Sequence, residues 1–589
     1  MSGAYALENA MTLEPIDAAT ESLIRRGSVI NKNNNKCLVS RPHGVQVTGL
    51  AVAVALVSSP LWAGETIEFD NGATIDWSVT TSYGIGMRLG NASDRLMGVN
   101  VDDANRNFDR HSLTTNRVGA LGEMILRKDN YGAVVRASTF YDDVYHRSND
   151  NDSPKTVNKF GSNDEFTSDT RYYSGGRTRL LDAYVFGGWS FENDTMLDVK
   201  AGRHIESWGE SLYYPGVNGV QNPSDAVKAA QPGVEVKEVL LPVGQVSASY
   251  RINPEITLGA YVQYEWKGTE LPPVGSYLSG SDVIGPGREF IYSPVSPVTP
   301  SGMIPYRGTD EPRDSGQWGA QVRFRPVSSL EMSLFHVVYH DKNPATALVG
   351  YDAADLGNGQ FMYKTNGYRV KYFDDIKLTG VSATTKLGEV QVGAEWSYRD
   401  GAPVMVNTGL GPVPTRGKGQ QLQLSAMRIL GDQPWASQTT LTGEIITVRV
   451  DDVDDVSGAP NLTDVNLIAS MAPTVKPSND YTYKTASAWR TRSSSAYTLG
   501  ASFSYPGVFT GWDLEVPFTF SNVFSGAAPM SGSIAGVAGD RRLSAGTTFK
   551  YLSNLEMSFK YIAYLGEPDP IYRPLADRDY ATFSMKYSF

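Results

Sequence analysis

The sequence predicts an all-β protein, an antiparallel transmembrane β-barrel of about 16–18 strands with long external loops. Three observations predict it. Segments with alternating apolar and polar residues recur along the whole chain after residue 63. The spacers between these segments alternate between short and long. The chain ends on such a segment, whose last residue is Phe589. Because lipid cannot hydrogen-bond a sheet edge, a sheet of this kind in a membrane must close on itself.

The alternation is clearest in the last ten residues, YATFSMKYSF. Ala581, Phe583, Met585, Tyr587 and Phe589 share one face, and the intervening residues are mostly polar. This is the period-2 pattern of a strand with one apolar face. We place such segments near residues 74–89, 112–127, 131–146, 179–192, 196–208, 244–252, 256–268, 317–327, 330–342, 367–386, 389–400, 418–430, 436–451, 495–505, 512–524, 541–552, 555–566 and 578–589.

The spacers indicate how the strands are connected. Tight spacers contain turn-forming residues, such as the Asn-Pro-Glu at 253–255 and the glycine at 388. Long spacers lie near 90–111, 147–178, 209–243, 269–316, 343–366, 401–417, 452–494, 525–540 and 567–577. Their alternation is typical of an up-and-down barrel with turns at one end and loops at the other. The last strand should then pair with the first, near 74–89.

The N-terminal segment, residues 1–63, is expected to be a leader. The apolar run LAVAVALV at 50–57 is too short to span a membrane as a helix. It is followed by small residues, which is typical of a secretory signal with cleavage after Ala63. The segment before it is acidic and asparagine-rich, so either the start codon is assigned too early or the n-region is long. Residues 64–589 are expected to form the barrel.

Composition narrows the function classes. The only cysteine, Cys37, lies in the expected leader, which fits an exported chain without a disulfide framework. The formal net charge is −11, so nucleic acid is not an expected partner. A soluble sandwich or propeller would also show alternating faces, but it would need several linked domains or a repeat, and neither is visible.

Two stretches resemble a known family. One runs from Asn105 to Met124, and the other from Gly202 to Val243 contains the Trp-Gly-Glu-Ser run at 208–211, the Asn-Pro at 222–223 and the run from Pro232 to Pro242. Together they resemble the domain-of-unknown-function 1302 family of proteobacterial outer-membrane proteins. The resemblance implies the outer membrane of a Gram-negative bacterium. It also implies movement of lipophilic molecules together with an inner-membrane exporter of the resistance-nodulation type and a periplasmic partner.

The final strand also resembles the assembly signal of bacterial outer-membrane proteins, because it ends on phenylalanine with alternating aromatic residues behind it. That resemblance implies recognition by the barrel-assembly machinery. Outer-membrane lipids and lipopolysaccharide would then surround the barrel.

The long spacer after the fifth predicted segment is the first candidate functional site. A barrel of 16–18 strands has a lumen too wide for side chains alone to fill, so Gly209 to Val243 is expected to fold inward as a plug or constriction. A solvated external loop is the alternative. The polar and aromatic candidates are Glu206, Trp208, Glu210, Asn222, Lys228, Glu235, Lys237 and Glu238.

Charged residues on the polar face of the strands are the second candidate set. Their signs are mixed, which more often wets a channel wall than selects ions. The lumen-facing candidates are Glu123, Arg136, Lys200, Arg203, Glu265, Arg323, Arg325 and Glu395.

Other motifs are weaker. Asp103, Asn105, Asn107 and Asp109 alternate oxygen ligands and could hold Ca²⁺, but the glycine and terminal glutamate of an EF-hand are missing, and a solvated loop is the commoner state. No metal site and no cofactor are therefore predicted. No G-x-S-x-G motif is present, and no catalytic residue is predicted. The chain is thus expected to be a channel or transporter for lipophilic or amphipathic molecules and not an enzyme. A general or solute-specific porin and a lipid-modifying barrel enzyme are the alternatives.

Overall fold

The computed structural model describes residues 64–454 and 491–589, apart from 65, 157, 297–298, 358–359, 409–410, 528–529, 531, 533 and 571. The expected leader, residues 1–63, lies outside the described residues. Its cleavage stays a prediction.

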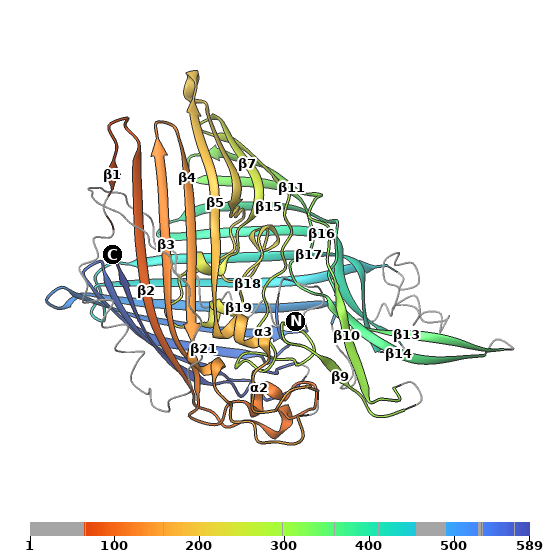
Figure 1. The fold of residues 1–589 in the computed structure, drawn as a ribbon. Coiled ribbons are helices and arrows are strands. Elements are labelled where there is room, and N and C mark those ends of the chain that lie inside the picture. Colours follow the sequence, from red (N-terminus) through yellow and green to blue (C-terminus); the bar gives the residue numbers. More distant parts are fainter. Residues whose placement is uncertain are drawn as a thin grey trace, which may run out of the picture.

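A closed antiparallel barrel forms the body of the protein (Figure 1). The main sheet contains 19 strands, and β1 (Ile67–Glu68) pairs only with β2, which leaves 18 in the ring. The ring strands are β2 (Thr74–Arg88), β3 (Leu113–Lys128), β4 (Tyr131–Asp142), β5 (Gly176–Ser190), β6 (Met196–His204), β7 (Val243–Asn253), β8 (Ile256–Gln263), β11 (Gln317–Val327), β12 (Leu330–Tyr339), β15 (Ile376–Leu387), β16 (Val390–Thr408), β17 (Gly411–Leu430), β18 (Gln438–Val453), β19 (Ser493–Phe509), β20 (Trp512–Ser525), β21 (Arg541–Tyr551), β22 (Leu555–Tyr564) and β23 (Tyr580–Ser588). The predicted fold class is confirmed.

The ring closes where the sequence predicts. β23 pairs antiparallel with β2, in a register that runs from Thr80 opposite Ser588 to Arg88 opposite Tyr580. The backbone N–H of Phe589 continues this ladder and donates to the carbonyl of Val79 at 3.0 Å. The first and last strands of the ring therefore leave no edge exposed.

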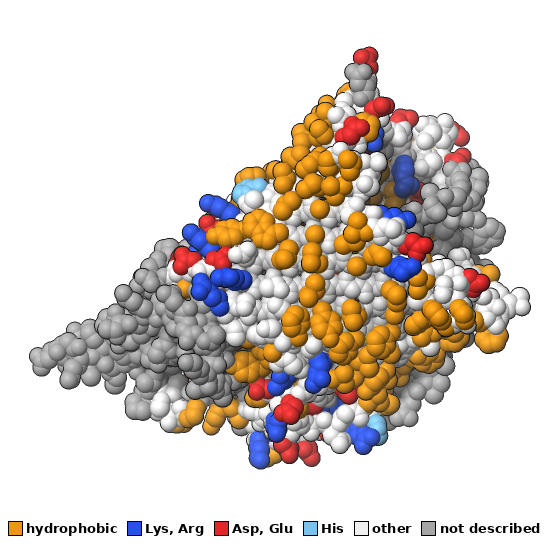
Figure 2. Space-filling view, turned by 180° about the vertical axis from the view of Figure 1, so that it is seen from behind, with side chains coloured by type: hydrophobic (Ala, Val, Ile, Leu, Met, Phe, Trp, Pro, Cys, Tyr) orange, Lys and Arg blue, Asp and Glu red, His pale blue; other side chains and the backbone are white. Residues whose placement is uncertain are grey.

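The two faces of the barrel wall differ in chemistry. On β17, Gln421 and Gln423 are buried in the interior, while Leu422 and Leu424 are exposed on the outside. The same outward pattern recurs at Val135, Val185, Val246, Val262, Trp318, Leu334, Trp396, Leu441, Ile445, Leu499 and Phe559. Figure 2 shows hydrophobic side chains spread over this outer face, with charged side chains mainly around its border. An exposed apolar band around a closed sheet is what contact with lipid hydrocarbon requires.

Tight turns and long loops alternate as predicted, with three corrections. The predicted strand 367–386 is divided between two sheets, because its first residues belong to a strand outside the ring and its last residues to β15 of the ring. The predicted long spacer 401–417 is mostly strand, because β16 and β17 extend into it and Val404 is buried against the loop residue Met530. The predicted spacers 269–316 and 343–366 contain a second sheet, made of β9 (Phe290–Tyr292), β10 (Met303–Asp310), β13 (Thr346–Gly357) and β14 (Gln360–Lys371). These strands pair with one another and not with the ring.

Helices are short and lie in the connections. They are α2 (Asp103–Arg106), α3 (Ser168–Thr170), α4 (Asn218–Gln221) and α5 (Val236–Val239), with single turns at η2 (Asp94–Leu96), η3 (Asp143–His146), η4 (Arg171–Gly175), η5 (Glu192–Asp194) and η6 (Lys228–Ala230). In the described part of the chain, no helix is long and apolar enough to cross a membrane.

Candidate functional site

Residues 205–242, which connect β6 to β7, fold into the barrel interior and are called here the inserted segment. The segment includes α4, η6 and α5 and is held by side chains of the wall strands on two sides. The helices of this segment are only three or four residues long, so many of its backbone N–H groups have no helical partner. The wall satisfies several of these groups with buried carboxylates.

Glu395 on β16 is the first such carboxylate. It is 2 % exposed and accepts hydrogen bonds from the backbone N–H groups of Glu210, at 2.9 Å, and Val217, at 2.8 Å. Glycines allow the backbone to come this close. A Cβ atom at Gly209 or Gly216 would lie 2.2 Å or 2.1 Å from a Glu395 oxygen, and Gly209 also has a φ of +99°.

Glu444 on β18 holds the next turn of the segment. It is 3 % exposed and accepts from the N–H groups of Leu212 at 3.2 Å, Tyr213 at 2.6 Å and Tyr214 at 2.9 Å. The Tyr213 hydroxyl also lies 2.5 Å from Thr442 Oγ1. Five backbone N–H groups of the inserted segment thus end on two wall carboxylates, an arrangement of charge-assisted hydrogen bonds.

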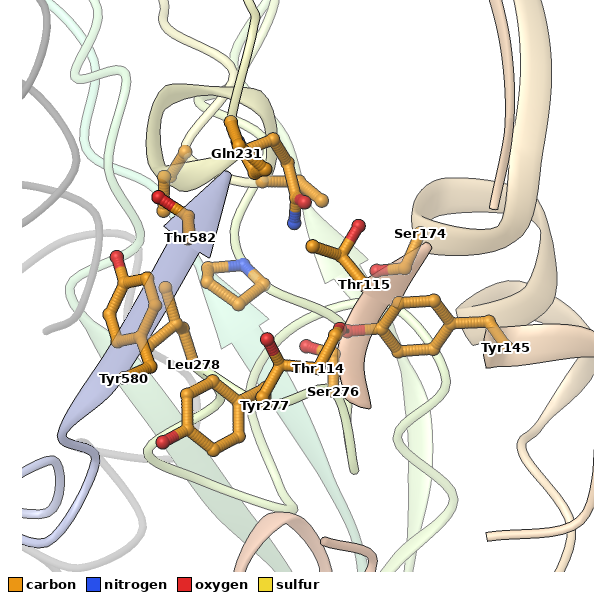
Figure 3. Close-up of a pocket in the computed structure, with 15 residues that line it drawn as sticks. Thr114, Thr115, Tyr145, Ser174, Gln231, Ser276, Tyr277, Leu278, Tyr580 and Thr582 are labelled. Atoms are coloured by element: carbon orange, nitrogen blue, oxygen red, sulfur yellow. Dashed lines mark hydrogen bonds between the residues drawn. The ribbon is translucent and has the colours of Figure 1, made fainter. Parts of the chain in front are cut away.

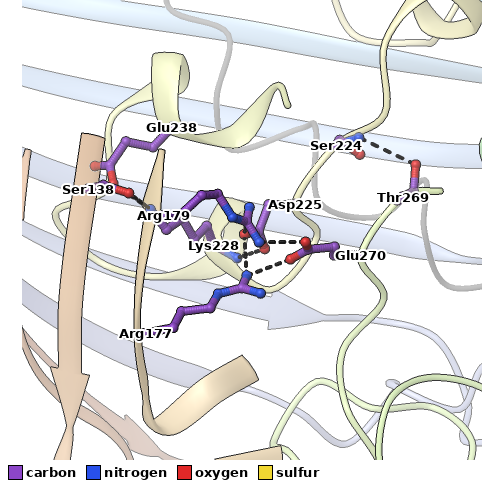
Figure 4. Close-up of polar contacts among 9 residues, drawn as sticks. All are labelled: Ser138, Arg177, Arg179, Ser224, Asp225, Lys228, Glu238, Thr269 and Glu270. Atoms are coloured by element: carbon purple, nitrogen blue, oxygen red, sulfur yellow. Dashed lines mark hydrogen bonds and ion pairs between the residues drawn. The ribbon is translucent and has the colours of Figure 1, made fainter. Parts of the chain in front are cut away.

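The other side of the inserted segment is bound by an ion-pair network (Figure 4). Asp225 is fully buried and accepts from Arg177 at 2.8 Å and Arg179 at 3.1 Å, both on β5. Glu270, from the loop after β8, lies 2.5 Å from each of the same two arginines. Two carboxylates and two guanidinium groups therefore neutralise one another at this wall.

Lys228 and Lys237 make further contacts with the same wall. Lys228 is buried, lies 2.6 Å from Glu238, and donates to Ser138 on β4 at 2.7 Å (Figure 4). Burial lowers the pKa of Lys228, and the neighbouring Glu238 offsets part of that shift. Lys237 forms ion pairs with Glu235 and with Glu123 on β3.

The first residues of the inserted segment contact β6–β8 and β12. The Trp208 ring lies 4.9 Å from the Tyr261 ring and 6.4 Å from the Phe335 ring. Glu206 accepts from Ser247 on β7 at 2.7 Å, and the Asn222 amide donates to the Glu206 carbonyl. These contacts fix the point at which the chain leaves β6 and turns inward.

Two pockets lie on different sides of the inserted segment. The loop-side pocket (Figure 3) has a volume of about 20 Å³, and aromatic, apolar and hydroxyl side chains surround it. Tyr145, Tyr277, Leu278 and Tyr580 are among them, and residues 226–232 form one side. This volume is close to that of one water molecule, so the interior is nearly filled here.

The turn-side cavity is larger, at about 270 Å³, and residues 206–210 form one side. Its charged residues carry both signs and are Asp198, Lys200, Glu206, Glu210, Arg323 and Glu331. Burial raises the pKa of Glu210 above its ordinary value. The strands that line it, β6–β8, β11 and β12, do so near their tight turns.

The structure brings the predicted residues together as follows. The first candidate set lies in the inserted segment, and its members contact wall strands or one another. Of the second set, Glu395 and Glu123 bind the inserted segment directly, and Arg136 joins Glu123 to Asp182. Lys200 and Arg323 line the turn-side cavity.

Three members of the second set lie elsewhere. Arg203 and Glu265 pair with each other at 2.5 Å at the loop end of β6. Arg325 is half-exposed at the turn end of β11 and pairs with Glu331 at 2.6 Å. On β6, Arg203 has the opposite parity to Lys200 and to the buried His204. Parity along a strand also does not give the height of a residue in the barrel.

The sequence reasoning missed several residues of this site. Glu444 occupies a polar position of a predicted strand and could have been found by the parity rule. Arg177 precedes the predicted start of its strand, and Glu270 lies in a predicted loop, so no periodic signal marks them. Asp225 lies in the spacer predicted to fold inward, where no periodic signal marks it either.

Comparisons with known proteins agree with the resemblance seen in the sequence. A family model described as "Protein of unknown function (DUF1302)" matches residues 45–589. No curated protein matches the chain. Among solved structures, Acinetobacter baumannii OccAB4 is 9 % identical with a TM-score of 0.40, covering 88 % of this chain and 100 % of that one. Acinetobacter baumannii OccAB1 is 7 % identical with a TM-score of 0.41, covering 87 % and 96 %. The Salmonella typhi OmpF complex with daunomycin is 9 % identical with a TM-score of 0.33, covering 88 % and 99 %.

Proposed function

We propose, on the premise that the chain belongs to the family described as "Protein of unknown function (DUF1302)", that it is a gated channel of the Gram-negative outer membrane. The inserted segment is the gate. A ring of 18 strands with an apolar exterior supports a membrane location, and such rings are typical of outer membranes.

One observation supports the proposal that the inserted segment is a gate. The inserted segment is bound by β3–β5 on one side and by β16–β18 on the other. In the ring, six strands separate these two groups in one direction (β6, β7, β8, β11, β12 and β15) and six in the other (β19 to β23 and β2). The contacts therefore join opposite walls, so the segment crosses the lumen and separates the loop-side pocket from the turn-side cavity.

The chemistry of the two pockets supports an amphipathic molecule as the transported solute. Aromatic and apolar side chains dominate the loop-side pocket, whereas charges of both signs line the turn-side cavity. The loop-side pocket has a volume of only about 20 Å³ while the inserted segment is in place. Once that segment has moved, a molecule with an apolar body and a polar head would meet matching chemistry on each side. We further propose that such a molecule reaches the turn end of the barrel from an inner-membrane exporter and a periplasmic partner. The family resemblance implies both of these proteins.

Planar-bilayer conductance tests the gate. The purified mature protein is compared with a variant that lacks residues 212–235, which carry most of the cross-lumen contacts. We expect rare or small openings from the intact protein and large, stable openings from the variant, because an 18-stranded ring encloses a wide lumen. Equal conductance in the two proteins would rule the gate out. Large, stable openings in the intact protein would favour a general porin.

Flux from proteoliposomes tests the substrate class. Vesicles loaded with a fluorescent fatty acid or with a fluorescent disaccharide are compared, using the same two proteins. Selective release of the fatty acid supports an amphipathic solute, and selective release of the disaccharide contradicts it. Hydrolysis of a labelled phospholipid by the purified protein would instead favour a barrel enzyme.

A further inference from the structure

Three long loops meet at a group of buried carboxylates outside the lumen. Asp102 and Asp103 belong to the connection between β2 and β3, and Asp282 belongs to the connection between β8 and β9. All three are buried, at 0 %, 3 % and 1 % exposure, and their ligand oxygens lie within 4.8 Å of one another. We call these residues the loop cluster.

The loop cluster has unused hydrogen-bonding capacity. The Oδ1 atom of each of its three carboxylates is buried and has no hydrogen-bond partner among the residues that the structure describes. Buried oxygens without partners cost free energy unless another group satisfies them. The backbone N–H of Asp103 donates to Asp282 at 3.3 Å, which brings two of the loops together but leaves these oxygens free.

Asn158 gives an independent indication of a ligand. It comes from a third loop, between β4 and β5, and is 4 % exposed. Neither polar atom of its side chain has a hydrogen-bond partner in the described structure. Yet its amide is near enough to Asp282 to lower the pKa of that carboxyl. With this buried amide beside Asp282, the group offers carboxylate and amide oxygens, which are ligands typical of calcium.

Charge balance favours a cation. Arg106 forms an ion pair with Asp102. Lys159 attracts Asp103 and Arg578 attracts Asp282, while Glu289 adds negative charge. Three carboxylates buried this deeply cost free energy unless their negative charge is compensated, and a bound cation would supply the compensation.

We propose that the loop cluster and Asn158 bind one Ca²⁺ ion, which clamps the three external loops together. The ligand oxygens of the three carboxylates lie within 4.8 Å of one another, so they can meet at one ion. Carboxylate and amide oxygens from separate loops suit the flexible coordination of Ca²⁺, whereas Mg²⁺ demands near-ideal octahedral geometry and usually keeps several waters. This site differs from the sequence-based candidate, since only Asp103 of that run takes part. Asn105 instead contacts Arg88, and Asn107 donates to the Gly275 carbonyl at 2.9 Å.

Isothermal titration calorimetry on the full mature protein in detergent, after treatment with EGTA, tests the site. We expect one Ca²⁺ per chain. Asp282→Asn and Asp103→Asn should each weaken binding at least about 10-fold, because each removes a charged ligand. The exposed Asp152→Asn variant, in the same loop as Asn158, is the matched control and should bind as the unaltered protein does.

A second measurement keeps the proposal open to refutation if a variant fails to fold. In limited proteolysis, the protease should cut the external loops of the unaltered protein faster in EGTA than in CaCl₂. MgCl₂ should protect these loops less than CaCl₂ does. No binding of Ca²⁺ at millimolar concentration, or equal cleavage in all three solutions, overturns the proposal. Full-strength binding by a folded Asp282→Asn or Asp103→Asn protein does so as well.

Discussion

Glu395 accepts a hydrogen bond of 2.8 Å from the backbone N–H of Val217, a residue that precedes it by 178 positions. One residue belongs to the barrel wall and the other to the segment that crosses the lumen. In a sheet, a neighbouring strand accepts the hydrogen bonds of backbone N–H groups. Here a side chain of the wall accepts them instead, and these groups would otherwise be buried without partners.

Replacing Glu395 with alanine should loosen the inserted segment. Two backbone N–H groups would lose their acceptor, at a cost of about 1–3 kcal/mol each. We expect a lower midpoint of urea unfolding, followed by tryptophan fluorescence in detergent, and more frequent openings in planar bilayers. Glu389→Ala, at the exposed turn before the same strand, is the control and should change neither. Unchanged openings in Glu395→Ala would show that this carboxylate does not hold the gate.

Gly216→Ala should have a similar effect for a steric reason. Its methyl group would lie 2.1 Å from a Glu395 oxygen and 2.6 Å from Gln423, so the backbone has to move away. Gly122→Ala in β3 is the control, because nothing lies within 4 Å of its methyl position. Bilayer openings of the two variants should differ, and identical traces would contradict the close approach.

Asp225→Asn should destabilise the opposite attachment. The change leaves Arg177 and Arg179 with one charged partner, and breaking a buried ion pair costs about 3–5 kcal/mol. Urea unfolding should report this loss. Glu567→Gln removes an exposed ion pair with Arg95 and should cost less than about 1 kcal/mol. Equal effects of the two changes would mean that the Asp225 network adds no stability.

Lys342 should make stability depend on pH. It lies in the loop after β12, donates to Gln317 at 2.5 Å, and burial lowers its pKa to about 7. Its ordinary pKa is about 10.4, so between these values the unfolded state binds more protons and stability rises with pH. Lys342→Met should remove this rise between about pH 7 and pH 10. The exposed Lys155→Met should keep it, and parallel curves for Lys342→Met and the unaltered protein would refute the assignment.

Leu499 tests the lipid-facing surface. It is 52 % exposed on β19, and an arginine there should cost up to about 2–4 kcal/mol at mid-membrane depth. Ser249→Arg places the same side chain in the turn-side cavity and should cost less. Refolding yield into lipid vesicles, read as the gel shift between boiled and unboiled samples, compares the two. Equal yields would argue against a lipid-facing Leu499.

The barrel could be predicted from local pattern because each strand carries its own signal. Alternation at 581–589 assigns the apolar face of one strand without knowledge of any other, and lipid then requires closure of the whole sheet. The predicted pairing of the last strand with the first is confirmed. The extension of β16 could not be predicted, since burial of Val404 depends on Met530, a residue far away in the chain.

The sequence by itself determined the barrel, its closure and the alternation of turns and loops, because these follow from periodicity and from the chemistry of the surrounding solvent. Only the tertiary structure decided which groups meet inside and above the barrel. Glu444 meets the backbone of Tyr213 across 231 positions, and Asp103 meets Asp282 across 179. Such contacts depend on loops, whose sequences have no periodic pattern, and they therefore cannot be predicted from the sequence.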